Sequence, residues 1–332
     1  MNVIPLRLSH SSLELLNSCE RKFQLVKLLK GAEQEENEHL SFGHAFGAGV
    51  ASYAEHQDAD RALYAAWIAY WPQIESQKKF QTQCFALLLR AFQRLDTLLL
   101  DYDTVFHNGK VAAELSFKME INPEYYFVGH IDLILRHKYT GVYTVLEVKS
   151  TGLTLEDISP NYGNSGQAIG YSVALDAITG QKHDRFEVLY FVGQMKKNPF
   201  DAEIKVLPFR KTLLDRLNWF ISLGLDVERL ERMKELGIYP KRGSSCLAFN
   251  RPCRHYQTCG LSAHDVPKPP EIDETNYDFT FQMDELVADH LERAASFVDD
   301  TPAPPSSGTI ENIDTFELGN TNDIEHILDQ RF

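Results

Sequence analysis

The chain has 332 residues, of which 43% are hydrophobic and 24% are charged, and its formal net charge is −14. A chain of this length and apolar content can bury a large core without disulfides. No apolar run reaches the roughly 18 residues that a membrane-spanning helix needs, and the first residues lack a basic stretch followed by an apolar block. We therefore expect a protein of the cytoplasm.

The negative charge is concentrated at the C-terminal end. Of the 33 Lys and Arg residues and the 47 Asp and Glu residues, three and 17 lie after residue 261, so residues 1–261 carry 30 of each. A body with balanced charge can still attract phosphate, because binding depends on the field at a cleft rather than on the sum over the chain. The composition therefore does not exclude a nucleic-acid ligand.

Helical patterns dominate the first third of the chain. Apolar residues at helical spacing predict helices at residues 12–30, 42–70 and 81–101. Ser11 or Ser12 is the expected N-cap of the first helix. Cys84 falls on the apolar face of the third helix, so we expect it to be a buried core thiol.

The middle of the chain alternates between strand and helix patterns. Stretches rich in β-branched and aromatic residues predict strands at residues 111–117, 125–135, 142–149, 186–192 and 203–209. The first three strands are expected to form a meander, because only short turns separate them. Helices are expected at residues 166–178 and 212–236. Together these elements predict an α/β fold, with a central mixed β-sheet flanked by helices.

The composition changes after Cys259. Residues 262–332 are acidic and contain clusters of Pro and Ser, which is typical of linkers and tails. We expect a folded domain at residues 1–261 and a largely flexible tail at residues 262–332, with one helix at residues 281–297.

Three residues with potential chemistry lie on neighbouring predicted strands. Asp132 lies on the second strand of the meander, and Glu147 and Lys149 lie on the third. Residues two apart on a strand point to the same face, so Glu147 and Lys149 share a face. If the two strands pair about the intervening turn, Asp132 lies near Glu147 across the ladder.

Two adjacent carboxylates repel each other unless a cation lies between them, and oxygen ligands suit Mg²⁺ or Mn²⁺. Such a cation can acidify a water molecule and neutralise charge on a phosphoryl group, while Lys149 contacts the phosphate or the water. This is the chemistry of phosphodiester hydrolysis. The alternative interpretation is an ordinary Glu-x-Lys ion pair on a strand.

The pattern Gly129-x-x-Asp132, followed by Glu147-x-Lys149, resembles the core of RecB-like PD-(D/E)XK nucleases. Gln167 and Tyr171, four residues apart on one predicted helix, are similar to the Q-x-x-x-Y motif of that group. Phe42-Gly43-His44-Ala45 resembles its histidine-bearing helix. The resemblance implies a restriction-endonuclease-like fold, metal ligation by His44, Asp132 and Glu147, a catalytic Lys149, and DNA contacts by Gln167 and Tyr171.

Basic residues outside these motifs are candidates for contacts with the DNA backbone. Lys196 and Lys197 lie in a loop between two predicted strands, and Lys241 and Arg242 precede Cys246. Phosphate contacts by such residues give DNA affinity that depends on salt.

The five cysteines do not form an obvious disulfide framework, because their number is odd and we expect a reducing compartment. Cys246, Cys253 and Cys259 cluster near the end of the predicted domain, and Cys19 lies near its start. This arrangement resembles AddB-type and CRISPR-adaptation nucleases, in which four cysteines hold a [4Fe–4S] cluster that joins the two ends of the domain. Four thiolates can also bind Zn²⁺.

The resemblance implies a metal-dependent DNA exonuclease or end-processing nuclease of recombination, repair or phage DNA processing. Its substrate would be DNA that is single-stranded or has free ends, and its location the cytoplasm of a bacterium or of a phage's host. The alternative is an inactive DNA-binding or partner-binding protein stabilised by the cluster. The acidic tail is a candidate contact for a replication or recombination protein, or a DNA mimic.

Overall fold

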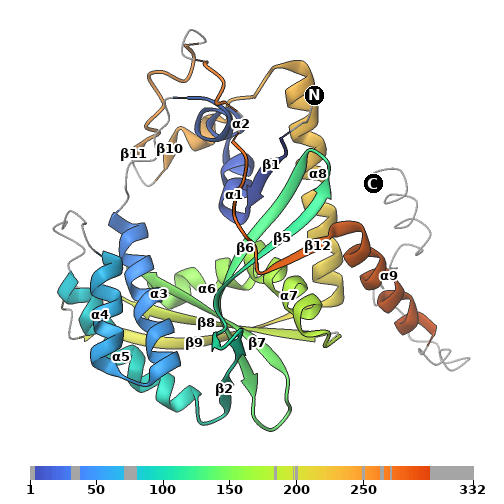
Figure 1. Cartoon of the computed structure of the whole chain (residues 1–332). Helices are drawn as coiled ribbons and strands as arrows, with labels where there is room; N and C mark the ends of the chain where they lie inside the picture. The colour runs from blue at the N-terminus through green and yellow to red at the C-terminus, as the bar shows by residue number, and fades with distance from the viewer. Residues whose placement is uncertain are drawn as a thin grey trace, which may run out of the picture.

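A mixed β-sheet forms the centre of the computed structural model (Figure 1), which describes residues 4–30, 38–70, 81–182, 185–196, 198, 201–248, 251–261, 265–269 and 271–299. Within these residues the sheet has eight strands, and its main order is β12-β5-β6-β7-β8-β9. None of the described helices is both long and apolar enough to cross a membrane.

The expected meander is present in the sheet. β5 (Ala113–Asn122), β6 (Tyr125–His137) and β7 (Tyr143–Thr151) pair antiparallel in sequence order. β8 (Arg185–Gln194) then pairs parallel to β7, and β9 (Glu203–Thr212) pairs antiparallel to β8. The predicted mixed sheet is therefore confirmed.

Three short strands complete the sheet. β1 (Leu6–Ser9) pairs parallel to the first half of β6, and β2 (Tyr102–Thr104) pairs antiparallel to its end. β12 (Phe279–Gln282) pairs parallel to β5. Two small hairpins lie outside the sheet: β3 (Phe106–His107) with β4 (Lys110–Val111), and β10 (Leu247–Ala248) with β11 (Arg251–Pro252).

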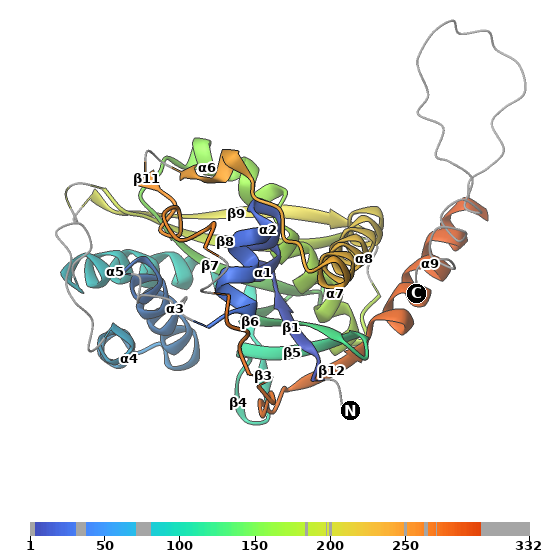
Figure 2. The same cartoon turned by 90° about the horizontal axis from the view of Figure 1, so that it is seen from above.

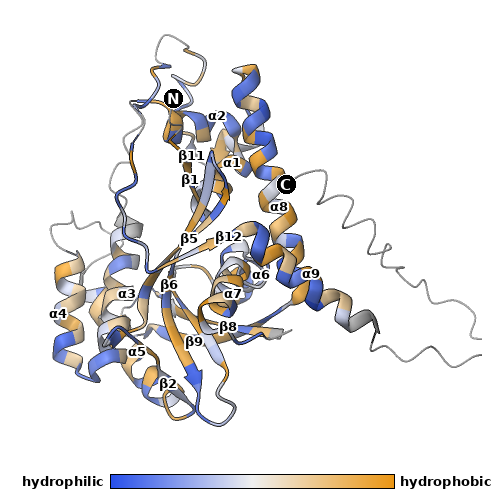
Figure 3. Cartoon of the chain, turned by 45° about the vertical axis from the view of Figure 1, so that its right-hand side comes forward, coloured by the Kyte–Doolittle hydropathy of each residue, from blue (hydrophilic) through white to orange (hydrophobic). Residues whose placement is uncertain are grey.

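The side chains of the strands point alternately to the two faces of the sheet, and a hydrophobic core lies on each face. On β8, Val188 and Tyr190 join one core, whereas Leu189 and Phe191 join the other. Successive side chains of a strand point to opposite faces, so a strand buried on both faces is apolar throughout. Figure 3 accordingly shows mostly hydrophobic residues along the central strands.

Helices cover both faces of the sheet (Figure 2). α3 (Glu38–His56), α4 (Ala59–Tyr70) and α5 (Gln81–Leu98) build the core on one face, in which Cys84 is buried as expected. The other face is covered mainly by α6 (Leu155–Gly163), α7 (Gly166–Thr179) and α8 (Leu213–Leu236). The predicted fold class, a mixed sheet flanked by helices, is thus confirmed.

The first helix differs from its prediction. α1 (His10–Ser18) is capped by Ser9, because the Ser9 and Ser12 hydroxyls accept each other's backbone N–H groups. Cys19 is extended and separates α1 from α2 (Glu20–Phe23), which the π-helix η1 (Gln24–Leu28) follows. The expected N-cap at Ser11 or Ser12 and the unbroken helix at 12–30 are therefore wrong.

The segment after residue 261 is more ordered than its composition predicts. β12 extends the sheet, and α9 (Met283–Asp299) buries Met283, Val287 and His290. These residues are four and three positions apart, so they share one helix face. The apolar spacing thus outweighs the acidic composition up to Asp299. Residues 300–332 of the expected tail lie outside the described residues.

Candidate active site

The candidate site lies where β1 and β7 separate along one edge of β6, at residues 129–132 and the facing part of β7. We call this place the fork. β1 pairs with β6 as far as Val128, and β7 pairs with the same edge of β6 from Leu133 onward. Residues 129–132 therefore lie between two ladders, where β7 diverges towards β8. A cavity of about 650 Å³ opens there, between the start of α1, α3 and α7.

Asp132 and Glu147 meet at this fork. Leu133 pairs with Leu146 in the last register position of the ladder, so Asp132 and Glu147 are opposite at the next position. The carboxylate of Asp132 accepts a hydrogen bond from the backbone N–H of Val148 at 2.7 Å. This hydrogen bond holds β7 next to β6 beyond the last pair of the ladder.

Glu147 is fully buried, and its two oxygens have different surroundings. Oε1 lies 2.7 Å from the Nζ of Lys149, whereas Oε2 has no hydrogen-bond partner among the described residues. Burial, and then the charge of Asp132, raise the pKa of Glu147 to about 8. Burial likewise raises the pKa of Asp132, against the opposing charge of Lys149. A buried carboxylate with an unsatisfied oxygen favours a cation.

Lys149 connects the acids to α7. Its Nζ donates to the Oε1 of Gln167 at 3.1 Å, and the Nε2 of Gln167 donates to the Tyr171 hydroxyl at 2.8 Å. Burial lowers the pKa of Lys149, but Glu147 and Asp132 outweigh it, so the pKa is raised overall. Gln167 and Tyr171 share a helix face as expected, and here they orient Lys149.

Gly129 lets α7 approach the fork closely. A Cβ atom at Gly129 would lie 2.5 Å from Phe117 and 2.9 Å from the ring of Tyr171. Glycine is required at such a close approach. The glycine of the sequence motif therefore provides space for Tyr171.

A third carboxylate lines the cavity. Glu114 has a φ of +52°, which is rare for a residue with a side chain and is a form of backbone strain. Burial, and then the charge of Asp132, raise the pKa of Glu114 to about 7. A positive φ leaves no signal in the sequence, so this conformation of Glu114 is known only from the structure.

Histidines reach the cavity from two helices. His44 on α3 is exposed and lines the cavity, where a positive charge on its ring would oppose the rise in the pKa of Asp132. His10, at the start of α1, lies 3.2 Å from Glu14. Sequence reasoning missed His10 and Glu14, which also line the cavity, although their spacing of four residues places them on one helix face.

None of the described basic residues that were predicted to contact the DNA backbone lines this cavity. Lys196 pairs with Glu203 at 2.8 Å, and Lys241 is exposed. The guanidinium of Arg242 binds both carboxylate oxygens of Glu20, a residue that is only 2% exposed. Arg242 thus neutralises a buried charge. Lys197 lies outside the described residues.

The cysteines of the two chain ends lie in neighbouring segments. Cys19 is buried, whereas Cys246, Cys253 and Cys259 are half-buried, and all four thiols are free. Arg21 connects the segments, because its N–H donates to the carbonyl of Pro240 and its Nε donates to that of Cys259 at 3.1 Å. The chain therefore brings the Cys19 region to the C-terminal cysteine loop.

In the part of the chain that the structure describes, no three His, Cys, Asp or Glu side chains lie close enough together to hold a metal ion. The chemistry of Asp132 and Glu147 nevertheless fits a hard divalent cation. Their carboxylates are buried, adjacent and raised in pKa, and Oε2 of Glu147 lacks a partner.

The mixed sheet flanked by helices is consistent with the fold of a known nuclease superfamily. A family model described as the PD-(D/E)XK nuclease superfamily matches residues 7–294, and the chain belongs to this superfamily.

Two solved structures are distantly similar to the chain. One, from Eubacterium rectale and described as a "Putative exonuclease", is 15% identical, with a TM-score of 0.45 over 77% of this chain and 94% of its own. The other, of a protein designated SSO0001, is 13% identical, with a TM-score of 0.26 over 71% and 91%. Neither similarity supports an argument about function. No curated protein matches the chain.

Proposed function

We propose that the chain is a DNA nuclease that depends on Mg²⁺ or Mn²⁺ and acts on unpaired strands or free ends. One observation carries the proposal: the fork brings Asp132, Glu147 and Lys149 together in one cavity, with Glu147 buried beside Lys149. An ion pair on a strand surface would instead be exposed to solvent.

Asp132 and Glu147 are the residues that would hold the cation, with Glu114 or His44 as a further ligand. The cation would supply positive charge at the scissile phosphate and lower the pKa of a water molecule. Asp132 also holds Val148 in place, which keeps the two acids aligned. The ammonium of Lys149, oriented by Gln167, donates to a phosphate oxygen as charge develops there.

We also propose that Cys19, Cys246, Cys253 and Cys259 hold a [4Fe–4S] cluster, with Zn²⁺ as the alternative. The contacts of Arg21 with Pro240 and Cys259, and of Arg242 with Glu20, support this because they join the residues that follow Cys19 to the segment that bears the other three cysteines. The cluster would supply a cross-link between the two ends of the domain. The acids of the fork would carry out hydrolysis without it.

Digestion of end-labelled DNA tests the proposed function. Linear and circular single strands and a blunt duplex are incubated with the full chain and Mn²⁺, Mg²⁺ or EDTA. We expect metal-dependent degradation of the linear strand, with the circle resistant if the enzyme needs an end. Cutting of the circular strand would show that the protein is a nuclease that does not need a free end.

Lys149→Ala and Asp132→Asn should each reduce the rate at least about 100-fold, because each removes a transition-state interaction rather than core packing. Lys205→Ala, at an exposed position of β9, is the matched control and should retain full activity. If both site variants kept more than a tenth of the wild-type rate, the fork would not be the active site. No hydrolysis by the wild type would favour the alternative, an inactive DNA-binding or partner-binding protein.

The biological setting and the partner belong to the proposal as well. A nuclease of this kind serves recombination, repair or phage DNA processing. Its acidic C-terminal residues are the proposed contact for a replication or recombination protein, because 17 acidic residues and three basic ones follow residue 261. Removal of residues 300–332 and pull-down of the partner would test this contact.

A further inference from the structure

A second and larger cavity lies beside the candidate active site. It measures about 760 Å³ and is formed by β1, η1, Tyr126 of β6 and the segment before β12. We call this segment, residues 265–269 and 271–278, the C-terminal strap. Arg7 lines both this cavity and the one at the fork, so the two are adjacent through a single side chain.

The C-terminal strap is fixed to the N-terminal segment and to the sheet. Next to η1, the N–H of Lys30 donates to the carbonyl of Val266 at 2.7 Å, and that of Lys268 donates to Leu28 at 2.9 Å. At the other end, Asp278 accepts hydrogen bonds from the backbone and the hydroxyl of Ser116. These contacts hold the strap between η1 and β5 and give the cavity defined walls.

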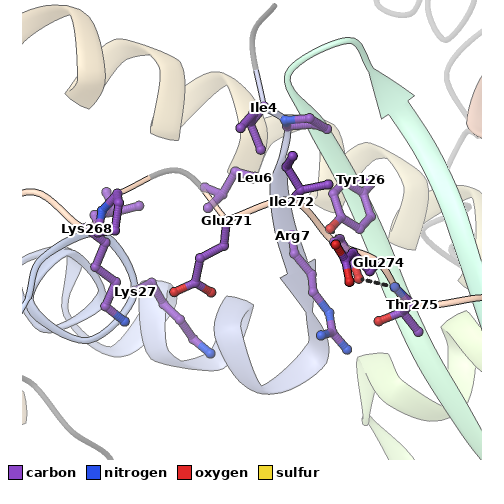
Figure 4. Close-up of a pocket in the computed structure, with 14 residues that line it drawn as sticks. Ile4, Leu6, Arg7, Lys27, Tyr126, Lys268, Glu271, Ile272, Glu274 and Thr275 are labelled. Atoms are coloured by element: carbon purple, nitrogen blue, oxygen red, sulfur yellow. Dashed lines mark hydrogen bonds between the residues drawn. The ribbon is translucent and has the colours of Figure 1, made fainter.

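Three cations gather in this cavity. Figure 4 shows Lys27 and Arg7 extending to the same side of the strap, with Lys268 near Lys27. Burial, and then the positive charges of Lys268 and Arg7, lower the pKa of Lys27. Like charges held together in a half-buried site are stabilised by an anionic ligand.

The acids that line the cavity are on the strap. Asp273 is already engaged, because it accepts hydrogen bonds from the hydroxyls of Tyr126 at 2.6 Å and Tyr277 at 2.7 Å. Glu271 and Glu274 are exposed. In Figure 4 the carboxylate of Glu271 points to the same side as Lys27, where it would compete with a bound phosphate.

Apolar side chains accompany the cations. Ile4 is 37% exposed and Ile272 is 74% exposed, and both line the cavity. Cations together with exposed aliphatic side chains suit a ligand that has both phosphates and unpaired bases. A duplex keeps its bases stacked inside, so it would present its phosphates but not the faces of its bases to these aliphatic side chains.

We propose that this cavity binds the phosphodiester backbone of a single nucleic-acid strand, through Lys27, Lys268 and Arg7, next to the fork. The site gives the nuclease a hold on the unpaired strand outside its cutting site. That the bound strand is also the substrate rests on the proposed function.

Equilibrium binding in EDTA tests the site without hydrolysis. Fluorescence anisotropy measures the affinity of the full chain for a labelled oligothymidylate and for a blunt duplex hairpin over a range of salt concentrations. Lys27→Gln is the main variant, because Lys268 also donates to the carbonyl of Val26 and its loss could disturb η1. Lys205→Gln, the same charge change on β9 outside both cavities, is the control.

We expect Lys27→Gln to weaken binding of the single strand several-fold and to reduce the slope of log affinity against log salt by about 0.7, the value for one phosphate contact on a single strand. Glu271→Gln should tighten binding of the same strand, because it removes the competing carboxylate. Lys205→Gln should change neither quantity.

Wild-type affinity and slope in Lys27→Gln would overturn the inference, as would equal weakening for the single strand and the duplex. The two proposals fail separately. If the wild type hydrolyses DNA but Lys27→Gln binds the single strand normally, only this inference is wrong. If Lys27 supports strand binding but the wild type has no hydrolytic activity, only the proposed function is wrong.

Discussion

Gly129 shows how a single residue controls the geometry of the fork. Its missing Cβ leaves room for Phe117 and for Tyr171, which is bonded through Gln167 to Lys149. A methyl group at this position must displace at least one of the two rings. The glycine therefore affects both the packing of the core and the orientation of Lys149.

Gly129→Ala should lower the free energy of unfolding by about 1–3 kcal/mol, the usual cost of overpacking. Activity should also fall, because Tyr171 and Gln167 shift. Gly47→Ala is the control: Gly47 lies in α3, lines the same cavity, and a Cβ there meets no atom within 4 Å. Alanine in a helix should stabilise it by roughly 0.5–1 kcal/mol. Urea unfolding measures both changes, and a stabilising Gly129→Ala would refute the packing argument.

Part of the geometry of the candidate site could be predicted from the sequence. Glu147 and Lys149 are two positions apart and Gln167 and Tyr171 are four apart, so strand and helix periodicity alone places each pair on one face. The strain at Glu114 and the approach of His10 could not be predicted. Both depend on contacts between strands and helices that lie far apart in the chain.

At the scale of elements, a buried ionic cluster holds α9 against α7 and α8. Asp176 on α7 binds Arg216 on α8 and, at 3.1 Å, Arg293 on α9. His290 on α9 packs edge-on against Phe220, and its Nδ1 lies 2.7 Å from the carbonyl of Leu286. Burial lowers the pKa of His290 to about 4 from its ordinary value of 6.5.

His290 should make stability depend on pH. Below pH 6.5 the unfolded chain binds a proton at this histidine, while the folded chain stays neutral down to about pH 4. The contribution of His290 is therefore complete above pH 6.5 and is lost as the pH falls to about 4. The loss amounts to up to about 3 kcal/mol, since one pKa unit corresponds to about 1.4 kcal/mol.

His290→Phe should reduce the difference in unfolding free energy between pH 4 and pH 7 by that amount. Phenylalanine keeps the contact with Phe220 and has no titrating group. His56→Gln, at the end of α3 and away from this interface, should leave the difference unchanged. The measurement is denaturant unfolding at several pH values. Parallel curves for His290→Phe and the wild type would show that His290 is not held neutral.

Neither the pairing of β1 with β6 nor that of β12 with β5 could be predicted from the sequence. Each has four residues, and each pairs parallel to a strand more than 100 residues away in the sequence. Short strands carry too few alternating positions to be recognised, and parallel pairing leaves no turn signal. The acidic composition around β12 also concealed Phe279, and Phe281 was assigned to the predicted helix at 281–297. Both side chains pack against the core.

At the scale of the whole molecule, β12 and α9 are the last described elements of the chain, and both pack against the rest of the domain. A chain that stops at residue 299 should fold and melt close to wild type, because it retains β12 and α9. A chain that stops at residue 261 loses both, so it uncovers β5 and the apolar face below α9 and should be insoluble or strongly destabilised. Solubility and thermal melting of the two chains give the answer. A stable chain ending at residue 261 would show that β12 and α9 are dispensable.

The proposed cysteine cluster would also act at this scale. A cross-link between Cys19 and the loop at 246–259 would close more than 200 residues and would remove much entropy from the unfolded chain. Cys19→Ala should therefore yield protein without iron and with a lower melting temperature. Cys84→Ala, in the core of α5, should keep its iron and lose only packing energy. Metal analysis and melting curves on anaerobically purified protein test this. Full iron content in Cys19→Ala would contradict a cluster that Cys19 shares with the other three cysteines. Zinc in place of iron in the wild type would correct only the identity of the metal.

Because β12 pairs with β5, the sheet can be completed only late in synthesis of the chain. β12 pairs with residues 117–120 of β5, yet its own residues 279–282 are made about 160 residues later. At roughly 5–20 residues per second, the outer edge of β5 has no partner for about 10–30 s on the ribosome. An unpaired strand edge of this kind recruits other chains. Crowded or rapid expression should therefore favour aggregation of nascent chains, which slower synthesis at low temperature should reduce.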